Sequence, residues 1–218
     1  MTLRLRDDLV HTARRMHDLG LAPGTTGNVS VRTTSGFLVT PSGMTYADLR
    51  GDDAVELRAD GTGRAGQRTP SSEWRLHRDI LTARPDAHAI VHTHSLFCTT
   101  VACLRRPIPA IHYMVVLAGG DEIPCADYAT FGSPELATQV VRALGPGHAC
   151  LMANHGMVAL GPTLDAALRL AAEVESLASQ YWHAAQLGAP HILDRDELAR
   201  VRHRFAEYGQ PKRARRPT

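Results

Sequence analysis

The stretch AHAIVHTHSLFCTTVACL, residues 87–104, decides the fold class, because it places a strand directly before a helix. Residues 87–91 are mostly apolar and short enough for a buried strand, which runs into His92-Thr93-His94. Residues 96–104 follow as a helix. A buried strand that feeds a helix is typical of α/β proteins, in which helices cover a sheet.

Elements of both kinds alternate on either side of this stretch. Upstream, Leu5, Leu9, Ala13 and Met16 recur at helical spacing, and Gly20 follows as a stop signal. We expect strands at 28–32, 37–40 and 55–58, and a helix at 73–84. Downstream, we expect strands at 111–117 and 149–153, and helices at 133–145, 164–187 and 194–208. The pattern predicts one α/β domain over residues 1–210.

The composition excludes several classes of protein. The chain has 218 residues, of which 44% are hydrophobic and 21% charged, so it is neither disordered nor fibrous. It has no run of 18 apolar residues, and its charged N-terminal residues do not resemble a secretory signal. No two of the four cysteines are spaced C-x-x-C, which favours reduced core thiols and a cytoplasmic location.

Charge is concentrated at the C-terminal end. The formal net charge is +2, and four basic side chains lie in the last seven residues. The remainder holds 20 basic and 22 acidic residues, a balance of −2. We therefore expect no nucleic-acid or membrane surface on the domain, and we interpret residues 211–218 as a disordered basic tail.

Three histidines follow apolar strands in a pattern that indicates a metal site. His92 and His94 are two residues apart, so their side chains point to the same face of a strand end. His155 closes another apolar strand and precedes Gly156, which we expect to let the backbone turn sharply. Three imidazoles with a carboxylate or water form a common Zn²⁺ site.

Glu73 is the candidate fourth ligand, because it lies at the start of a helix whose dipole favours a carboxylate. His77 follows four residues later on the same helix face. Two readings stay open for His77: it is a fifth ligand, or it packs against or orients the glutamate. A chance H-x-H pair with ordinary core histidines is the alternative to the whole site.

Several motifs together resemble the class II aldolase/adducin family, and within it the L-fuculose-phosphate aldolases. They are GTTGNVSVR (24–32), FLVTPSGMTYADL (37–49), PSSEWRLH (70–77), VHTHSLFCTTVACL (91–104), IPAIHYM (108–114), IPCADYATFGSPEL (123–136) and NHG (154–156), and the segment FAEYG (205–209) fits as well. The resemblance covers most of the chain. It implies a three-layer α/β/α sandwich around a mixed, largely antiparallel sheet, assembled as a fourfold homotetramer with active sites at subunit interfaces.

The resemblance also implies roles for individual residues. One Zn²⁺ per subunit would be held by Glu73, His92, His94 and His155, and Glu73 would leave the metal to act as the acid/base. Tyr113 would donate a proton from a neighbouring subunit. Substrate and phosphate contacts would come from Gly27, Asn28, Ser42, Gly43, Ser71 and Ser72, and Phe131, Phe205 and Tyr208 would shape the aldehyde pocket.

The function implied is cleavage of a ketose 1-phosphate of the L-fuculose 1-phosphate type to dihydroxyacetone phosphate and a small aldehyde such as L-lactaldehyde. A 5-deoxyribulose-phosphate aldolase and a methylthioribulose-phosphate dehydratase are alternatives on the same scaffold, and a non-enzymatic adducin-like module is a third. Two departures from the family pattern are small: Ser42 replaces a frequent threonine, and Asn154 precedes the third histidine where a second histidine can occur.

Overall fold

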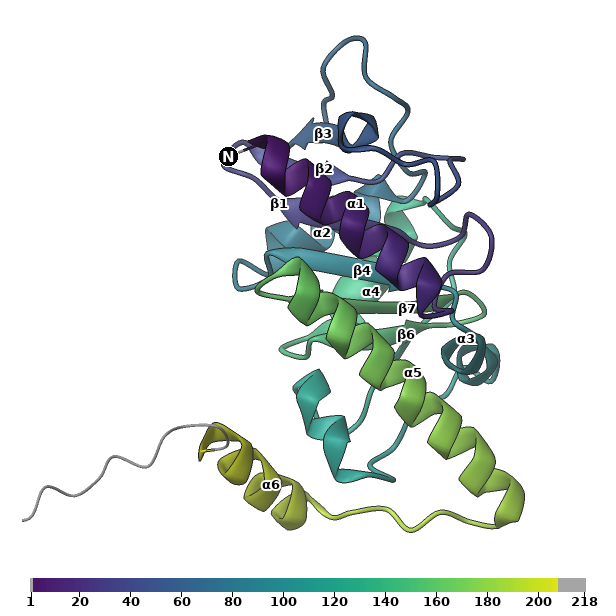
Figure 1. The fold of residues 1–218 in the computed structure, drawn as a ribbon. Coiled ribbons are helices and arrows are strands. Elements are labelled where there is room, and N and C mark those ends of the chain that lie inside the picture. The colour runs from purple at the N-terminus through teal and green to yellow at the C-terminus, as the bar shows by residue number, and fades with distance from the viewer. Residues whose placement is uncertain (1, 208–218) are drawn as a thin grey trace, which may run out of the picture.

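Seven strands form one mixed sheet at the centre of the computed structural model, which describes residues 2–207 (Figure 1). The strand order is β3-β2-β1-β4-β7-β6-β5, and neighbours are antiparallel except for the parallel pair of β5 and β6. The strands are β1 (Asn28–Arg32), β2 (Gly36–Val39), β3 (Val55–Arg58), β4 (Ala89–Thr93), β5 (Cys125–Ala126), β6 (Ala149–Met152) and β7 (Gly156–Gly161).

Helices cover both faces of this sheet, as expected from the alternating sequence pattern. One face packs against α1 (Thr2–Asp18), α3 (Leu96–Cys103) and α5 (Leu164–Leu187), and the other against α2 (Trp74–Ala83) and α4 (Pro134–Leu144) (Figure 1). Alternate residues of a strand therefore enter different cores: Val91 packs on the α1/α5 side and Ile90 on the α2/α4 side. This arrangement confirms the three-layer α/β/α class.

The segment 111–117 is not the strand that its apolar composition suggested. Residues Tyr113–Ala118 form a 3₁₀ helix, η2, on which the last helix α6 (Arg195–Glu207) packs (Figure 1). A second, shorter 3₁₀ helix, η1, spans Gly51–Asp53. The side chain of His112 accepts a hydrogen bond from the Met114 N–H, and Gly119 ends the helix with φ 83°. These end signals, rather than the apolar run, determine the local structure.

Two strands were absent from the sequence prediction. No element was expected for the segment between His155 and the long helix, whereas Gly156–Gly161 forms the fully buried strand β7. The short β5 pairs with β6 through two residues only. Because β7 lies between β4 and β6, it is the strand that brings His155 beside the pair on β4.

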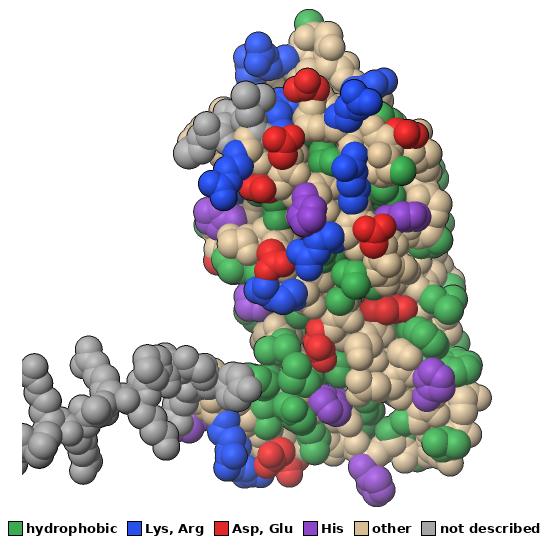
Figure 2. All heavy atoms as spheres, viewed as in Figure 1, with side chains coloured by type: hydrophobic (Ala, Val, Ile, Leu, Met, Phe, Trp, Pro, Cys, Tyr) green, Lys and Arg blue, Asp and Glu red, His purple; other side chains and the backbone are tan. Residues whose placement is uncertain are grey.

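Acidic and basic side chains are interspersed on the face shown in Figure 2, and hydrophobic side chains gather around η2 and the adjoining part of α5. No helix among residues 2–207 has the length and apolarity needed to cross a membrane. Cys98 and Cys150 are buried free thiols, as expected, but Cys103 is exposed and Cys125 half-buried, so not all four belong to the core. The basic tail at 211–218 lies outside the described residues.

Candidate metal centre

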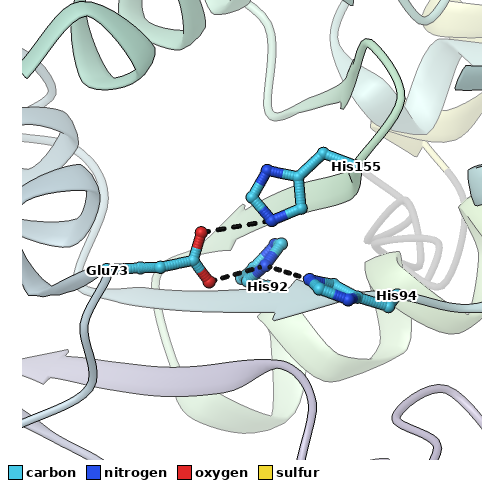
Figure 3. Close-up of side chains that lie close together, drawn as sticks. All are labelled: Glu73, His92, His94 and His155. Carbon is cyan, nitrogen blue, oxygen red and sulfur yellow. Dashed lines mark hydrogen bonds and ion pairs between the residues drawn. The ribbon is translucent and has the colours of Figure 1, made fainter. Parts of the chain in front are cut away.

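Four side chains from three separate parts of the chain point at one another (Figure 3). They are Glu73, His92, His94 and His155, and their ligand atoms all lie within 4.8 Å of one another. Glu73 Oε2 is 3.0 Å from His92 Nε2, and Glu73 Oε1 is 3.2 Å from His155 Nε2. The Nε2 atoms of His92 and His94 are 3.0 Å apart. The cluster could bind a metal ion.

The strand geometry of β4 explains how two of the ligands meet. His92 lies in the strand and His94 just after its end, so both side chains leave on the same side. The His92 Nδ1–H donates to the Met157 carbonyl oxygen on the neighbouring strand β7, at 2.9 Å. This hydrogen bond fixes the ring and directs Nε2 into the cluster, as backbone carbonyls bonded to the other ring nitrogen do for metal-binding histidines.

His155 comes from the tight connection between β6 and β7. The turn is made by Asn154, which has a left-handed φ of 54°, and not by Gly156, contrary to the expectation from sequence. Gly156 is required for a different reason: a Cβ atom there would lie 2.2 Å from the Thr93 carbonyl oxygen. The missing side chain lets β7 approach β4 closely at the point where His155 meets His94.

Glu73 is the N-cap residue of α2, so the helix begins one residue later than the sequence indicated. Its carboxylate does not cap the helix; it points away toward the histidines (Figure 3). The backbone N–H of Glu73 instead donates to Ser71 Oγ at 3.2 Å. The helix start therefore holds a buried carboxylate, only 6% exposed, against the end of β4.

The electrostatics of the cluster suit a cation. Burial raises the pKa of the Glu73 carboxyl, but the positive charge on His92 opposes this effect, and the net pKa lies far below its ordinary value. Burial and the neighbouring charges on His92 and His155 lower the pKa of His94 to about 4. Glu73 Oε1 is buried and accepts no well-directed hydrogen bond in residues 2–207. A metal ion would satisfy this oxygen and replace the protons that the imidazoles otherwise hold.

His77 is not a fifth ligand. It is fully buried, and both of its ring nitrogens are occupied: Nδ1 lies 2.6 Å from Ser30 Oγ, and Nε2 contacts Asn28 Oδ1. The Asn28 amide in turn donates from Nδ2 to Glu73 Oε2 at 3.0 Å. Of the two interpretations left open by the sequence, the contacts agree with the second, in which His77 acts behind the glutamate.

A cavity of about 290 Å³ opens beside the cluster. All six residues predicted to contact substrate and phosphate line it, together with Glu73, His94, His155 and Phe131. Their roles stay predictions, but the fold brings them to one wall from three separate segments of the chain. The six are Gly27, Asn28, Ser42, Gly43, Ser71 and Ser72.

The six residues of this wall carry no formal charge, and the described residues that line the cavity include no Lys or Arg. The backbone N–H groups of Ser42 and Ser71 donate to the carbonyls of Thr69 and Thr40 and are not available to a ligand. The hydroxyl groups remain, and so do the N–H groups of Gly43 and Ser72, for which no partner occurs among residues 2–207. Such uncommitted donors at a glycine turn and a helix start suit an anion.

Three further predicted residues either do not line this cavity or lie outside the described residues. Tyr113 is 46% exposed on η2 and stacks with Phe205 of α6 at 6.3 Å between ring centroids. Neither residue is among the described residues that line the cavity of its own chain. Tyr208 lies outside the described residues. The predicted role of Tyr113 in a neighbouring subunit's site stays untested, and so do the predicted roles of Phe205 and Tyr208 in the aldehyde pocket.

Glu175 supports the site and was missed in the sequence. This carboxylate, on α5, accepts the backbone N–H groups of Phe97 and Cys98 at 2.8 and 2.9 Å and the Ser95 hydroxyl at 2.7 Å. It thereby caps α3 directly after His94. A glutamate in the middle of a long helical pattern gives no sign of a distant cap, so no local signal could have identified it.

The chain resembles known proteins over nearly all of its length. Residues 7–182 match the model for the Class II Aldolase and Adducin N-terminal domain. A 5-methylthioribulose-1-phosphate/5-deoxyribulose-1-phosphate aldolase from Rhodospirillum rubrum is 53% identical, with 95% of this chain and 93% of that protein aligned. An L-fuculose phosphate aldolase from Escherichia coli K12 is 44% identical, with 94% and 96% aligned.

A solved structure of an L-fuculose 1-phosphate aldolase superposes with a TM-score of 0.90 at 35% identity, covering 93% of this chain and 96% of that one. The likeness therefore extends through the whole sandwich. This chain belongs to the class II aldolase and adducin family, and it is a class II aldolase.

Proposed function

We propose that the enzyme uses Zn²⁺ to cleave a ketose 1-phosphate to dihydroxyacetone phosphate and an aldehyde. The observation that carries the proposal is the convergence of Glu73 and three imidazoles beside a cavity with uncommitted neutral donors. Three histidines and one carboxylate are a common zinc donor set. When bound, the ion supplies Lewis-acid stabilisation of negative charge on substrate oxygens.

The residues of the chain would then handle protons and the phosphate. In the cleavage direction, the C4 hydroxyl must lose a proton as the C3–C4 bond breaks, and C3 of the three-carbon product must gain one. We assign the proton at C3 to Glu73, whose carboxylate faces both the cluster and the cavity. We assign the proton at the C4 oxygen to Tyr113 of a neighbouring subunit in a homotetramer.

The phosphate would be held by dipoles rather than by formal charges. We assign this role to the hydroxyl groups of Ser42, Ser71 and Ser72 and the N–H groups of Gly43 and Ser72, which belong to residues that line the cavity. Gly27 and Asn28 complete this wall, and Phe131, which is exposed at its rim, would contact the aldehyde part together with Phe205 and Tyr208.

The identities of the relatives favour one substrate class over another. The 53% identical relative is named for 5-methylthioribulose 1-phosphate and 5-deoxyribulose 1-phosphate, whereas the relatives named for L-fuculose phosphate are 43–45% identical. A second methylthioribulose/deoxyribulose aldolase is only 42% identical, so identity alone gives a modest preference. We propose a 5-deoxy- or 5-methylthio-ribulose 1-phosphate as substrate, with L-fuculose 1-phosphate as the second candidate.

Product analysis on the zinc-loaded full chain tests this function. Incubation with 5-deoxyribulose 1-phosphate, 5-methylthioribulose 1-phosphate and L-fuculose 1-phosphate should release dihydroxyacetone phosphate, and kcat/KM ranks the three. Loss of water from methylthioribulose 1-phosphate without dihydroxyacetone phosphate would identify a dehydratase instead. A protein that binds no metal and turns over none of the three would support the adducin-like module.

A further inference from the structure

Three buried polar side chains behind the metal cluster form a single line of hydrogen bonds. The line runs from Ser30 through His77 to Asn28, and it ends on the carboxylate of Glu73. Ser30 and His77 are fully buried, and Asn28 is 4% exposed. Buried polar groups are stable only when each donor meets an acceptor, so the direction of every bond in the line is constrained.

The direction follows from the glutamate end. A carboxylate only accepts hydrogen bonds, so Asn28 must turn Nδ2 toward Glu73 and Oδ1 toward His77. The Asn28 oxygen only accepts, so His77 must carry its proton on Nε2. His77 Nδ1 is then an acceptor, and the Ser30 hydroxyl donates to it. A reversed Asn28 amide would place oxygen against the carboxylate and N–H against N–H.

We propose that His77 is a positioning residue that holds Glu73 through Asn28. The Nε2–H of His77 locks the amide, and the locked amide keeps Glu73 Oε2 at its place 3.0 Å from His92 Nε2. Neither His77 nor Ser30 lines the cavity, so neither contacts substrate. This inference rests on the proposed function, because it takes Glu73 to be a metal ligand and the acid/base.

A double-mutant cycle on the zinc-loaded enzyme tests whether His77 acts on Glu73 through Asn28. We expect His77→Leu to lower both kcat and zinc affinity by about 10–100-fold, the range for outer-shell partners, with little change in KM. Asn28→Ala should have a similar or larger effect. In the double variant, kcat and zinc affinity should be almost the same as in Asn28→Ala alone, because His77 acts through the Asn28 amide, which is already absent. Effects that multiply would overturn the proposal.

A conservative variant and a matched control separate positioning from packing. His77→Gln keeps an N–H donor and should recover part of the kcat lost in His77→Leu at a similar melting temperature. Ile80→Val changes a fully buried side chain on the same helix and should lower stability while leaving kcat unchanged. A similar loss of kcat in Ile80→Val, or no recovery in a folded His77→Gln, would assign His77 a purely structural role.

A third test uses the wild-type protein, so its result does not depend on whether a variant folds. Nitrogen NMR of labelled histidines should show His77 neutral with its proton on Nε2, both with and without zinc. A proton on Nδ1 would contradict the proposed direction of the line. Zinc affinity, measured by chelator competition, is independent of turnover, so an inactive wild-type enzyme would refute the proposed function without deciding the role of His77.

Discussion

Gly156 lies so close to Thr93 that a Cβ atom on the glycine would be 2.2 Å from the Thr93 carbonyl oxygen. This contact joins the hairpin that carries His155 to the strand that carries His92. Gly156→Ala should push β7 away from β4 and separate the ligands. We expect a lower melting temperature and a loss in zinc affinity of about 10–100-fold, as for other changes in the support of metal ligands. Calorimetry and chelator competition measure the two effects.

Gly63 offers a matched control, because its nearest contact is the flexible end of the Leu57 side chain at 3.3 Å. Gly63→Ala should leave zinc affinity unchanged. Wild-type zinc affinity in Gly156→Ala would mean that the close approach of the two strands does not position His155.

Glu73→Gln should retain most of the zinc and lose turnover. Three imidazoles still hold the ion, whereas the amide cannot exchange the proton that the reaction needs. We expect kcat to fall by about 10²–10⁴-fold, the usual contribution of a positioned acid or base. Metal analysis and release of dihydroxyacetone phosphate are the measurements, and turnover within a few-fold of wild type excludes the acid/base role.

His94→Ala should lose both zinc and activity. It removes one of three neutral ligands, and the remaining pair with one carboxylate forms a weaker site. Full zinc occupancy in this variant would show that the ion is held by other residues. Glu56→Gln, on the distant strand β3, serves as the control and should change neither property.

Tyr113→Phe should fold, bind zinc and lose activity, since only a phenolic proton is removed. Its exposure and its distance from the described cavity wall of its own chain are what a residue serving a neighbour requires. Mixing inactive Glu73→Gln with inactive Tyr113→Phe should restore some activity after subunit exchange, because some sites then receive both wild-type groups. Mixed oligomers that stay inactive after proven exchange would rule out a shared site.

Glu175→Ala should destabilise the protein by about 1–2 kcal/mol, the cost of losing a charged helix cap. It leaves the N–H groups of Phe97 and Cys98 without their acceptor at the start of α3. Thermal unfolding should show a melting temperature lower by about 2–8 °C for a chain of this size. Glu175→Gln, which keeps one acceptor oxygen, should have a melting temperature between those of wild type and Glu175→Ala. An unchanged melting temperature in Glu175→Ala would refute the cap.

The ligand set was predictable from sequence because its signals are local. His92 and His94 share a face through the two-residue period of a strand, His155 closes another apolar strand, and Glu73 begins a helix. The resemblance to a family then supported all four as ligands. The alternation of strands and helices likewise indicated an α/β domain, whereas the three layers were implied by the resemblance. Local patterns show which side chains of one element share a face, but they do not show which residues of other elements pack against that face.

The parts that sequence reasoning missed depend on distant contacts. Nothing near Glu175 indicates that it caps a helix about 80 residues away in the chain, because a carboxylate in a helix is ordinarily solvated. The role of Gly156 required knowledge that β7 pairs with β4. At 111–117, an apolar run was compatible with strand or helix, and a side-chain cap by His112 decided between them.

The ligands come from the start of α2, the end of β4 and the hairpin of β6 and β7, so a bound ion would tie a helix of one layer to two strands of the next. Such a tie acts as a cross-link that exists only in the native state. Chelation should therefore speed global unfolding and expose the chain to proteolysis, in addition to stopping the reaction. In a cell short of zinc, the abundance of the enzyme would then fall together with its activity, since the metal-free protein would unfold and be degraded faster.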